Sequence, residues 1–127
     1  TNGLEIDSKY LIGDNGSIHF GYAYLNDNYK QDALSRYSLN SYKHRILMSF
    51  DHKLSTYVSQ FISFRYGVRE NQSDENDKSV IDYRIGFKKE RWETNIYLNN
   101  ILNSKYYETN LVEMPGRNIS INWKLIF

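Results

Sequence analysis

The chain has 127 residues, a formal net charge of +1 and no cysteine, so it is long enough for one domain and excludes disulfides and thiol chemistry. Its lysines and arginines are mixed with aspartates and glutamates, whereas a nucleic-acid-binding domain needs a clustered basic face, so no nucleic-acid partner is expected. The mean hydropathy is −0.68, and no apolar run is long enough to predict a transmembrane helix.

Alternation of apolar and polar residues with a period of two dominates the chain and predicts β-strands. The composition agrees, because the chain holds 12 Tyr and 6 Phe but one Pro, and aromatic residues favour pleated surfaces. In chain order, we expect strands at residues 3–12, 17–26, 43–52, 56–69, 80–88, 92–100 and 117–127. The expected fold class is all-β, an antiparallel up-and-down meander of about seven strands.

Each predicted strand has one apolar and one polar side. The apolar sides comprise, in chain order, Leu4, Ile6, Tyr10, Ile12, Ile18, Phe20, Tyr22, Tyr24, Ile46, Met48, Phe50, Val58, Ile62, Phe64, Tyr66, Val68, Ile81, Tyr83, Ile85, Phe87, Ile96, Leu98, Ile119, Ile121, Trp123, Leu125 and Phe127. The opposite sides include Glu5, Asp7, Lys9, His19, Ser63, Arg65, Asp82, Arg84, Lys88, Glu93, Asn95, Asn118, Ser120, Asn122 and Lys124. A half-buried sheet is the simplest structure with this pattern.

The connections between the predicted strands alternate between short and long. The short ones lie at 13–16, 53–55 and 89–91, and the long ones at 27–42, 70–79 and 101–116. Short turns at one edge, long loops at the other and strands of this length are typical of an outer-membrane β-barrel. A soluble β-sandwich or lipocalin-like barrel remains the alternative, with the apolar sides forming a core.

The number of strands and the first residues suggest a piece of a larger barrel. Closed bacterial barrels have even numbers of strands from eight upward, and seven is odd. The chain also opens on Thr1 within an alternating pattern rather than on a methionine. We therefore expect residues 1–127 to be one segment of a longer barrel.

The C-terminal part carries an ordered pair of motifs. The segment YLNNILNSKYYE at 97–108 is followed by MPGR at 114–117 and then by an alternating strand that ends on Phe127. This order resembles the C-terminus of TonB-dependent outer-membrane receptors, with Ile101 and Leu102 replacing the usual Leu and Phe. The positions that match the family motif are Asn100, Leu102, Asn103, Pro115, Gly116 and Arg117. A looser similarity to the family covers residues 41–54.

The resemblance implies a 22-stranded transmembrane barrel with a plug domain, in the outer membrane of a Gram-negative bacterium. Such receptors import scarce ligands such as iron–siderophores, haem or cobalamin, with energy supplied through TonB. Residues 1–127 would be the C-terminal segment of the barrel, without the plug and the earlier strands. The implied partners are outer-membrane lipid, TonB through the N-terminal part, the assembly machinery and a small-molecule ligand. The implied signal for assembly consists of Ile119, Ile121, Trp123, Leu125 and Phe127.

Aromatic and arginine side chains in the long loops are the candidates for ligand binding, because such residues anchor recognition surfaces. They are Arg36, Tyr37, Tyr42, Tyr106 and Tyr107. The alternative is that these tyrosines belong to the aromatic girdle at the outer membrane surface, and we favour this alternative for Tyr106 and Tyr107.

No motif predicts an enzyme, a cofactor or a metal site. His44 and His52 share one side of a strand but lie roughly 27 Å apart, too far for a metal pair, and His19 is on another strand. The acidic loop 70–79 lacks the central glycine of an EF-hand and is expected to be a solvated loop.

Two other functions remain open at this stage. A small autonomous outer-membrane barrel, acting as a porin or an adhesin, would share the strand pattern. A soluble lipid-binding β-barrel would also share it, but would need no detergent.

Overall fold

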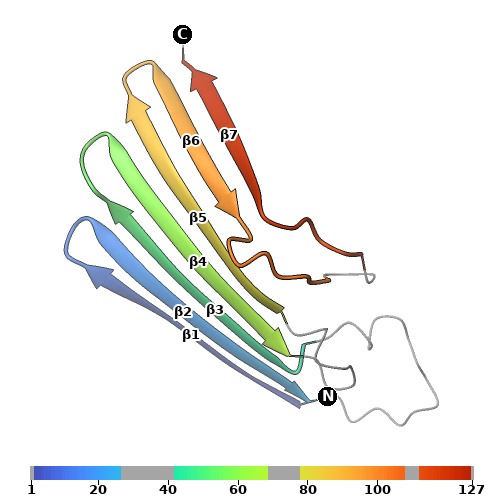
Figure 1. Cartoon of the computed structure of the whole chain (residues 1–127). Coiled ribbons are helices and arrows are strands. Elements are labelled where there is room, and N and C mark those ends of the chain that lie inside the picture. The colour runs from blue at the N-terminus through green and yellow to red at the C-terminus, as the bar shows by residue number, and fades with distance from the viewer. Residues whose placement is uncertain (1, 27–41, 69–77, 108–111, 127) are drawn as a thin grey trace.

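The computed structural model describes residues 2–26, 42–68, 78–107 and 112–126, and its strands form one antiparallel sheet (Figure 1). The strands are β1 (Asn2–Ile12), β2 (Gly16–Asn26), β3 (His44–Lys53), β4 (Val58–Val68), β5 (Lys78–Lys89), β6 (Trp92–Asn99) and β7 (Asn118–Leu125). Each strand pairs with the next one along the chain, so the predicted all-β meander is confirmed. The sheet is open, because β1 and β7 do not pair with each other. Within the described residues, no helix is long and apolar enough to cross a membrane.

The predicted strand boundaries agree with the described ones to within two residues, with two informative differences. β5 begins at Lys78, so Lys78 and Ser79 belong to the sheet and not to the polar loop predicted at 70–79. β6 ends at Asn99, because Asn100 adopts a left-handed conformation with φ of 49°. The second difference marks the start of the long connection between β6 and β7.

The ends of the strands form two different edges of the sheet. The short connections 13–15, 54–57 and 90–91 lie at one edge, together with the C-terminus (Figure 1). At the other edge, β2, β4 and β6 each run into a long connection to the next strand, and the N-terminus lies there too. We call these the turn edge and the loop edge. The predicted alternation of short and long connections is confirmed.

The strand register brings all the apolar sides onto one face of the sheet. In one row across the whole sheet, Ile119 pairs with Leu98, Leu98 with Tyr83, Tyr83 with Ile62, Ile62 with Phe50, Phe50 with Ile18 and Ile18 with Tyr10. We call the face to which this row belongs the apolar face, and the opposite one the polar face. Because side chains alternate along each strand, one register assigns every strand residue to a face.

The two faces differ sharply in charge. Every Asp, Glu, Lys and Arg within the seven strands belongs to the polar face, apart from Lys89 at the end of β5. The apolar face carries two histidines, His44 and His52, at opposite ends of β3. The rest of the apolar face is aliphatic or aromatic, with a few Ser, Thr, Gly, Asn and Gln residues.

The same row shows that the strands are staggered. Ile119 stands at the beginning of β7, whereas Tyr10, at the other end of the row, stands near the end of β1. Beyond this row, β7 continues to Leu125 towards the turn edge, and β1 extends back to Asn2 towards the loop edge. Each hairpin is therefore displaced along the strand direction relative to the one before it, and Figure 1 shows the resulting steps along the turn edge.

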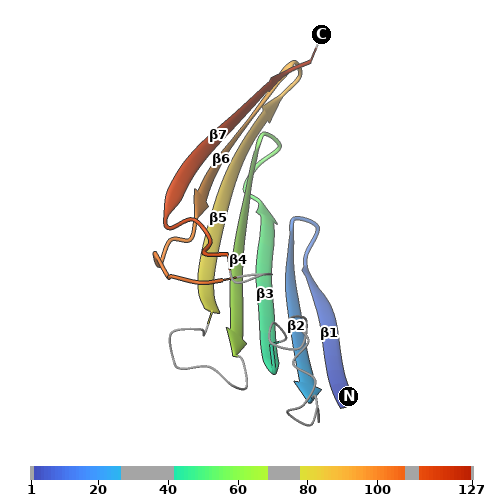
Figure 2. The same ribbon diagram turned by 90° about the vertical axis from the view of Figure 1, so that its right-hand side faces the viewer.

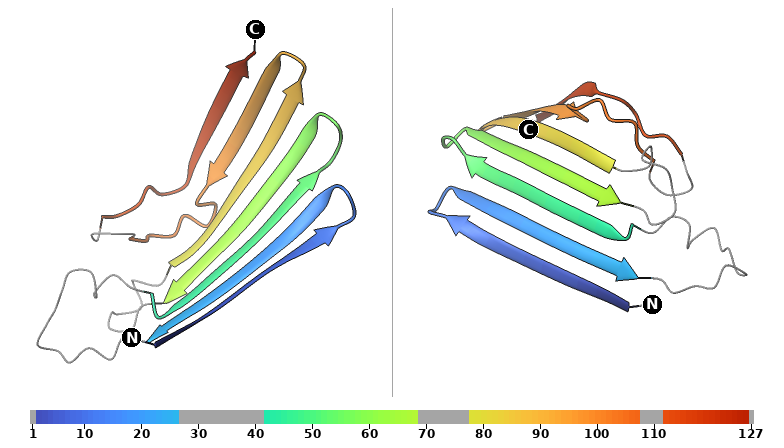
Figure 3. Two further views of the ribbon diagram at one scale, coloured as in Figure 1. Left: turned by 180° about the vertical axis from the view of Figure 1, so that it is seen from behind. Right: turned by 60° about the horizontal axis from the view of Figure 1, so that its bottom comes forward.

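The sheet is coiled rather than flat, as the views in Figures 2 and 3 show. Its buried side chains are not on the apolar face. In β4, near the centre of the sheet, Ile62 is 40% exposed although its neighbour Ser63 is only 9% exposed. Val80, on the polar face of β5, is fully buried. We infer that the polar face is the concave one, where side chains converge.

Candidate functional site

The connection between β6 and β7 is organised by residues of the C-terminal motifs. We call them the loop-base cluster: Asn100, Asn103, Ser104, Pro115, Gly116 and Arg117. The buried Asn100 side chain holds the two ends of this connection together. Its Nδ2 donates to the carbonyl oxygens of Ser104 at 2.8 Å and Pro115 at 3.3 Å. Its Oδ1 accepts a hydrogen bond from the backbone N–H of Ser104 at 2.9 Å.

Asn103 makes the second half of the cluster. It has φ of 54°, and asparagine tolerates this left-handed region better than most residues. Its Oδ1 accepts a hydrogen bond from the backbone N–H of Arg117 at 2.9 Å. A Cβ atom added to Gly116 would lie 2.9 Å from that same oxygen, so the glycine leaves room for it. The two motifs thus contact each other through Asn100 and Asn103.

The loop-base cluster is fastened to the polar face of the sheet. The backbone N–H of Asn100 donates to Oδ1 of Asp82 at 2.8 Å, and the other oxygen of Asp82 pairs with Arg65 at 2.7 Å. The hydroxyl of Ser104 donates to the carbonyl oxygen of Ser79 at 2.6 Å. Asp82 therefore joins an ion pair between two strands to the start of the connection.

Beyond the cluster, the connection folds back over the loop edge of the polar face. The Tyr106 ring is 6% exposed and lies 5.0 Å from Nζ of Lys78, which is itself 5% exposed. The same ammonium lies 5.9 Å from the ring centre of Tyr42, whose hydroxyl donates to the carbonyl oxygen of Tyr107 at 3.0 Å. We call these four residues the aromatic clamp. It joins the segment just before β3 to the connection that follows β6.

A glycine makes room for the clamp. A Cβ atom added to Gly67 would lie 2.6 Å from Cδ1 of Tyr42, so the ring occupies the space above this glycine. Gly67 pairs with Arg45 on one side and with Lys78 on the other. The Tyr42 ring is thus placed between two cationic side chains of neighbouring strands.

The predicted ligand-binding residues have different outcomes. Arg36 and Tyr37 lie outside the described residues, whereas Tyr42, Tyr106 and Tyr107 come together in the aromatic clamp. Tyr106 is buried against Lys78, and both the ligand-binding and the girdle interpretations of these tyrosines stay predictions.

Four residues of the predicted assembly signal lie along the apolar face of β7. Ile119, Ile121 and Trp123 are 67%, 69% and 64% exposed, and Leu125 is also exposed. Phe127 lies outside the described residues. Leu102, the apolar member of the family motif, is exposed on the loop and has no part in the hydrogen bonds of the loop-base cluster.

Each of the three histidines has a local partner. On the apolar face, Nδ1 of His44 lies 2.9 Å from the Tyr22 hydroxyl, and the ring of His52 stacks on Phe50 at 5.6 Å. On the polar face, Nε2 of His19 lies 2.9 Å from Asp7. Among the described residues, no group of three or more His, Asp and Glu could hold a metal ion.

Three residues of the site were missed by the sequence patterns: Arg45, Gly67 and Lys78. Lys78 looked like part of a polar loop, because the residues before it contain no hydrophobic side chain. The alternation did place Gly67 on the polar side of its strand, but nothing in the sequence tells that Tyr42 would lie above it. These three residues lie in one row across β3, β4 and β5, and finding that row requires the strand register.

Comparison with protein-family models, with curated proteins and with solved structures gave no match for this chain.

Proposed function

We propose that this chain is part of the wall of a transmembrane β-barrel, the C-terminal portion of a TonB-dependent outer-membrane receptor. The observation that carries the proposal is the contrast between Ile62 and Ser63, adjacent residues of a central strand. A water-soluble sheet would cover the isoleucine and expose the serine. In a membrane barrel the apolar side faces lipid and the polar side faces the interior.

The stagger of the strands supports a barrel. Closing a sheet into a barrel requires tilted strands whose register shifts steadily around the circumference. Here the row from Ile119 to Tyr10 passes from the start of β7 to the end of β1, so the shift accumulates in one direction. The unpaired sides of β1 and β7 would then bond to further strands of the same barrel, which also removes two open edges.

The two edges of the sheet support the orientation. Outer-membrane barrels have short turns on the periplasmic side and longer loops on the outside. The turn edge, with the end of β7, would therefore face the periplasm, and the aromatic clamp would lie on the outside. Trp92 and Trp123, on the apolar face near the turn edge, suit the inner aromatic girdle.

The loop-base cluster supports the particular family. The resemblance to TonB-dependent receptors depends on Asn100, Asn103 and the Pro-Gly-Arg segment at 115–117, and these residues contact one another. Their hydrogen bonds give a physical reason for the residues that the motif requires. The imported ligand would be an iron–siderophore, haem or cobalamin, with lipid around the apolar face and TonB acting through the N-terminal part. No enzymatic activity is proposed.

The position of the faces can be tested with spin labels in the full-length protein reconstituted into lipid vesicles. Met48 is exposed on the apolar face, and the next residue, Ser49, points to the polar face. A label on Met48→Cys should collide more with oxygen, which concentrates in lipid, than with a water-soluble nickel complex. A label on Ser49→Cys should show lower oxygen accessibility. Equal oxygen accessibility at both positions would contradict a lipid-facing apolar face.

The transport function needs a second experiment in cells. Deleting the gene should abolish uptake of one iron–siderophore, haem or cobalamin, and the restored protein should support uptake only when TonB is active. Uptake that persists without TonB would indicate an autonomous porin, and a protein found in the aqueous fraction without detergent would indicate a soluble barrel.

A further inference from the structure

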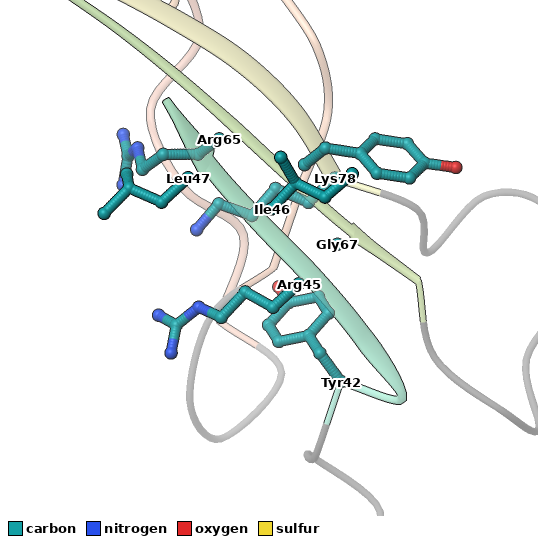
Figure 4. Close-up of a pocket in the computed structure, with 8 residues that line it drawn as sticks. Tyr42, Arg45, Ile46, Leu47, Arg65, Gly67 and Lys78 are labelled. Atoms are coloured by element: carbon teal, nitrogen blue, oxygen red, sulfur yellow. The ribbon is translucent and has the colours of Figure 1, made fainter. Parts of the chain in front are cut away.

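A small pocket opens on the polar face, at the loop edge of β3, β4 and β5 (Figure 4). Its volume is about 80 Å³. On the polar face, it is lined by the Tyr42 ring, the side chains of Arg45, Leu47, Arg65 and Lys78, and Gly67. We call it the Arg45 pocket. It would lie inside the barrel near the outer side, in the orientation proposed above.

The strand register concentrates positive charge around this pocket. Arg45, Gly67 and Lys78 form one row across three strands, and Arg65 belongs to the next row on the same face. Three cationic side chains thus come from three adjacent strands, and Figure 4 shows them extending to one side of the sheet. No residue that lines the pocket within the described part of the chain is acidic.

The three cations have different surroundings. Arg65 is paired with Asp82 at 2.7 Å, and Lys78 is held inside the aromatic clamp. Arg45 is exposed at the opening of the pocket and forms no ion pair with any described residue. It is therefore the guanidinium that can meet a molecule from solution. The Tyr42 hydroxyl donates to the carbonyl oxygen of Tyr107, and the Tyr42 ring occupies the space above Gly67. The ring therefore provides a flat surface beside the Arg45 guanidinium.

We propose that the Arg45 pocket binds an oxyanion group, a carboxylate or a phosphate, of a small molecule. A guanidinium offers two parallel N–H donors that match the two oxygens of such a group. The volume of about 80 Å³ exceeds the space that one water needs, so the pocket has room for such a group. This proposal deepens the proposed function, because it gives the chemical class of the imported ligand. The binding itself depends only on the pocket.

The test uses the full-length protein in detergent micelles, with 3-fluorotyrosine at position 42 as a fluorine NMR probe. This residue keeps the hydroxyl that bonds to Tyr107. Citrate and inorganic phosphate are titrated separately, at constant ionic strength, to distinguish a carboxylate site from a phosphate site. Sucrose is the neutral comparison. We expect a saturable shift of the fluorine signal with one of the two anions and none with sucrose.

The variants decide whether Arg45 causes the shift. Arg45→Gln should weaken binding about tenfold or more, and Arg45→Lys should weaken it less, because the charge remains but the paired donors are lost. Lys53→Gln is the matched control, since Lys53 lies on the same strand and the same face but at the turn edge. It removes the same charge and should leave binding unchanged.

Three results would overturn the proposal. One is the absence of a saturable shift with either anion, as would occur if an acidic side chain of the same protein already filled the pocket. Another is an unchanged affinity in Arg45→Gln, and the third is an equal loss in Lys53→Gln. The proposed function fails separately, if the spin labels show equal oxygen accessibility at positions 48 and 49 or if uptake does not require TonB.

Discussion

The two faces of the sheet are built from the same strands but differ in which kinds of side chain are exposed and which are buried. On the apolar face, aliphatic and aromatic side chains such as Met48 and Ile62 are exposed, and no strand residue is charged except Lys89. On the polar face, Ser63, Lys78 and Val80 are buried, and every other charged strand residue is found there. The amino acids of the apolar face suit a nonaqueous surrounding, whereas several charged groups of the polar face, such as Arg65 and Asp82, have partners within the chain.

The difference in exposure and charge between the two faces indicates which contacts stabilise each of them. Contacts within the described chain, such as the Arg65–Asp82 ion pair and the aromatic clamp, organise the loop half of the polar face. Within the described residues the apolar face has no ion pair, and we expect it to gain its stability from lipid. Substitutions on the two faces should therefore differ in their cost and in how that cost depends on the membrane.

The largest effect is expected for a charge placed on the apolar face. Ile121→Lys, at a position that is 69% exposed, should cost about 2–4 kcal/mol if this residue lies near the midplane of the membrane. The adjacent change Asn122→Lys, on the polar face, should cost much less. The measurement is the unfolding free energy of the full-length protein in lipid vesicles by urea titration. Equal costs for the two lysines would show that the apolar face does not contact lipid.

The sequence predicts the faces well because the period of two is a local property. Every predicted strand is found within two residues of its expected boundaries, and residues such as Ile85 and Asn122 lie on the predicted faces. The alternation also predicts the edges, since it stops where the short and long connections begin. Closure of the sheet into a barrel stays a proposal, because β1 and β7 do not pair with each other.

The site was less predictable, because its contacts join residues that are distant in the sequence. Tyr42 and Tyr106 both pack on Lys78, and no local pattern connects these three positions. The resemblance did single out Asn100 and Asn103, yet it gave no reason for them. The structure supplies that reason, since both side chains bond to the backbone of the loop.

The second prediction concerns the ion pair below the loop-base cluster. Asp82→Ala removes the acceptor of both Arg65 and the buried Asn100 N–H, so it should cost about 1–3 kcal/mol. Asp51→Ala is the matched control on the same face, because Asp51 is about half exposed and lies 3.8 Å from Arg84. That change should cost less than about 1 kcal/mol. Urea titration of both variants in vesicles measures the difference, and similar costs would mean that Asp82 does not support the loop.

The third prediction concerns the space above Gly67. Gly67→Ala should displace the Tyr42 ring and cost about 1 kcal/mol, at the low end for overpacking. Gly21→Ala on the same face should be neutral or slightly stabilising, because its added Cβ would have no neighbour closer than 3.8 Å. In a Tyr42→Ala background, the cost of Gly67→Ala should vanish. Persistence of the full cost in that background would exclude the ring as its cause.

The smallest effect is expected for Asp7 and His19, which pair on the polar face between β1 and β2. The Asp7 side chain is 64% exposed, so water and salt screen its attraction to a protonated His19. A double-mutant cycle with Asp7→Asn and His19→Gln should give a coupling energy below about 1 kcal/mol, and high salt should reduce it further.

The comparison of this pair with Asp82 matters because both lie on the same face, but the pair lies away from the aromatic clamp. A coupling above about 1.5 kcal/mol, insensitive to salt, would mean that another part of the full-length protein covers this region of the polar face. The buried, organised area would then extend from the loop edge of β3–β5 to β1, and the contrast between the two faces would be larger than these residues alone reveal.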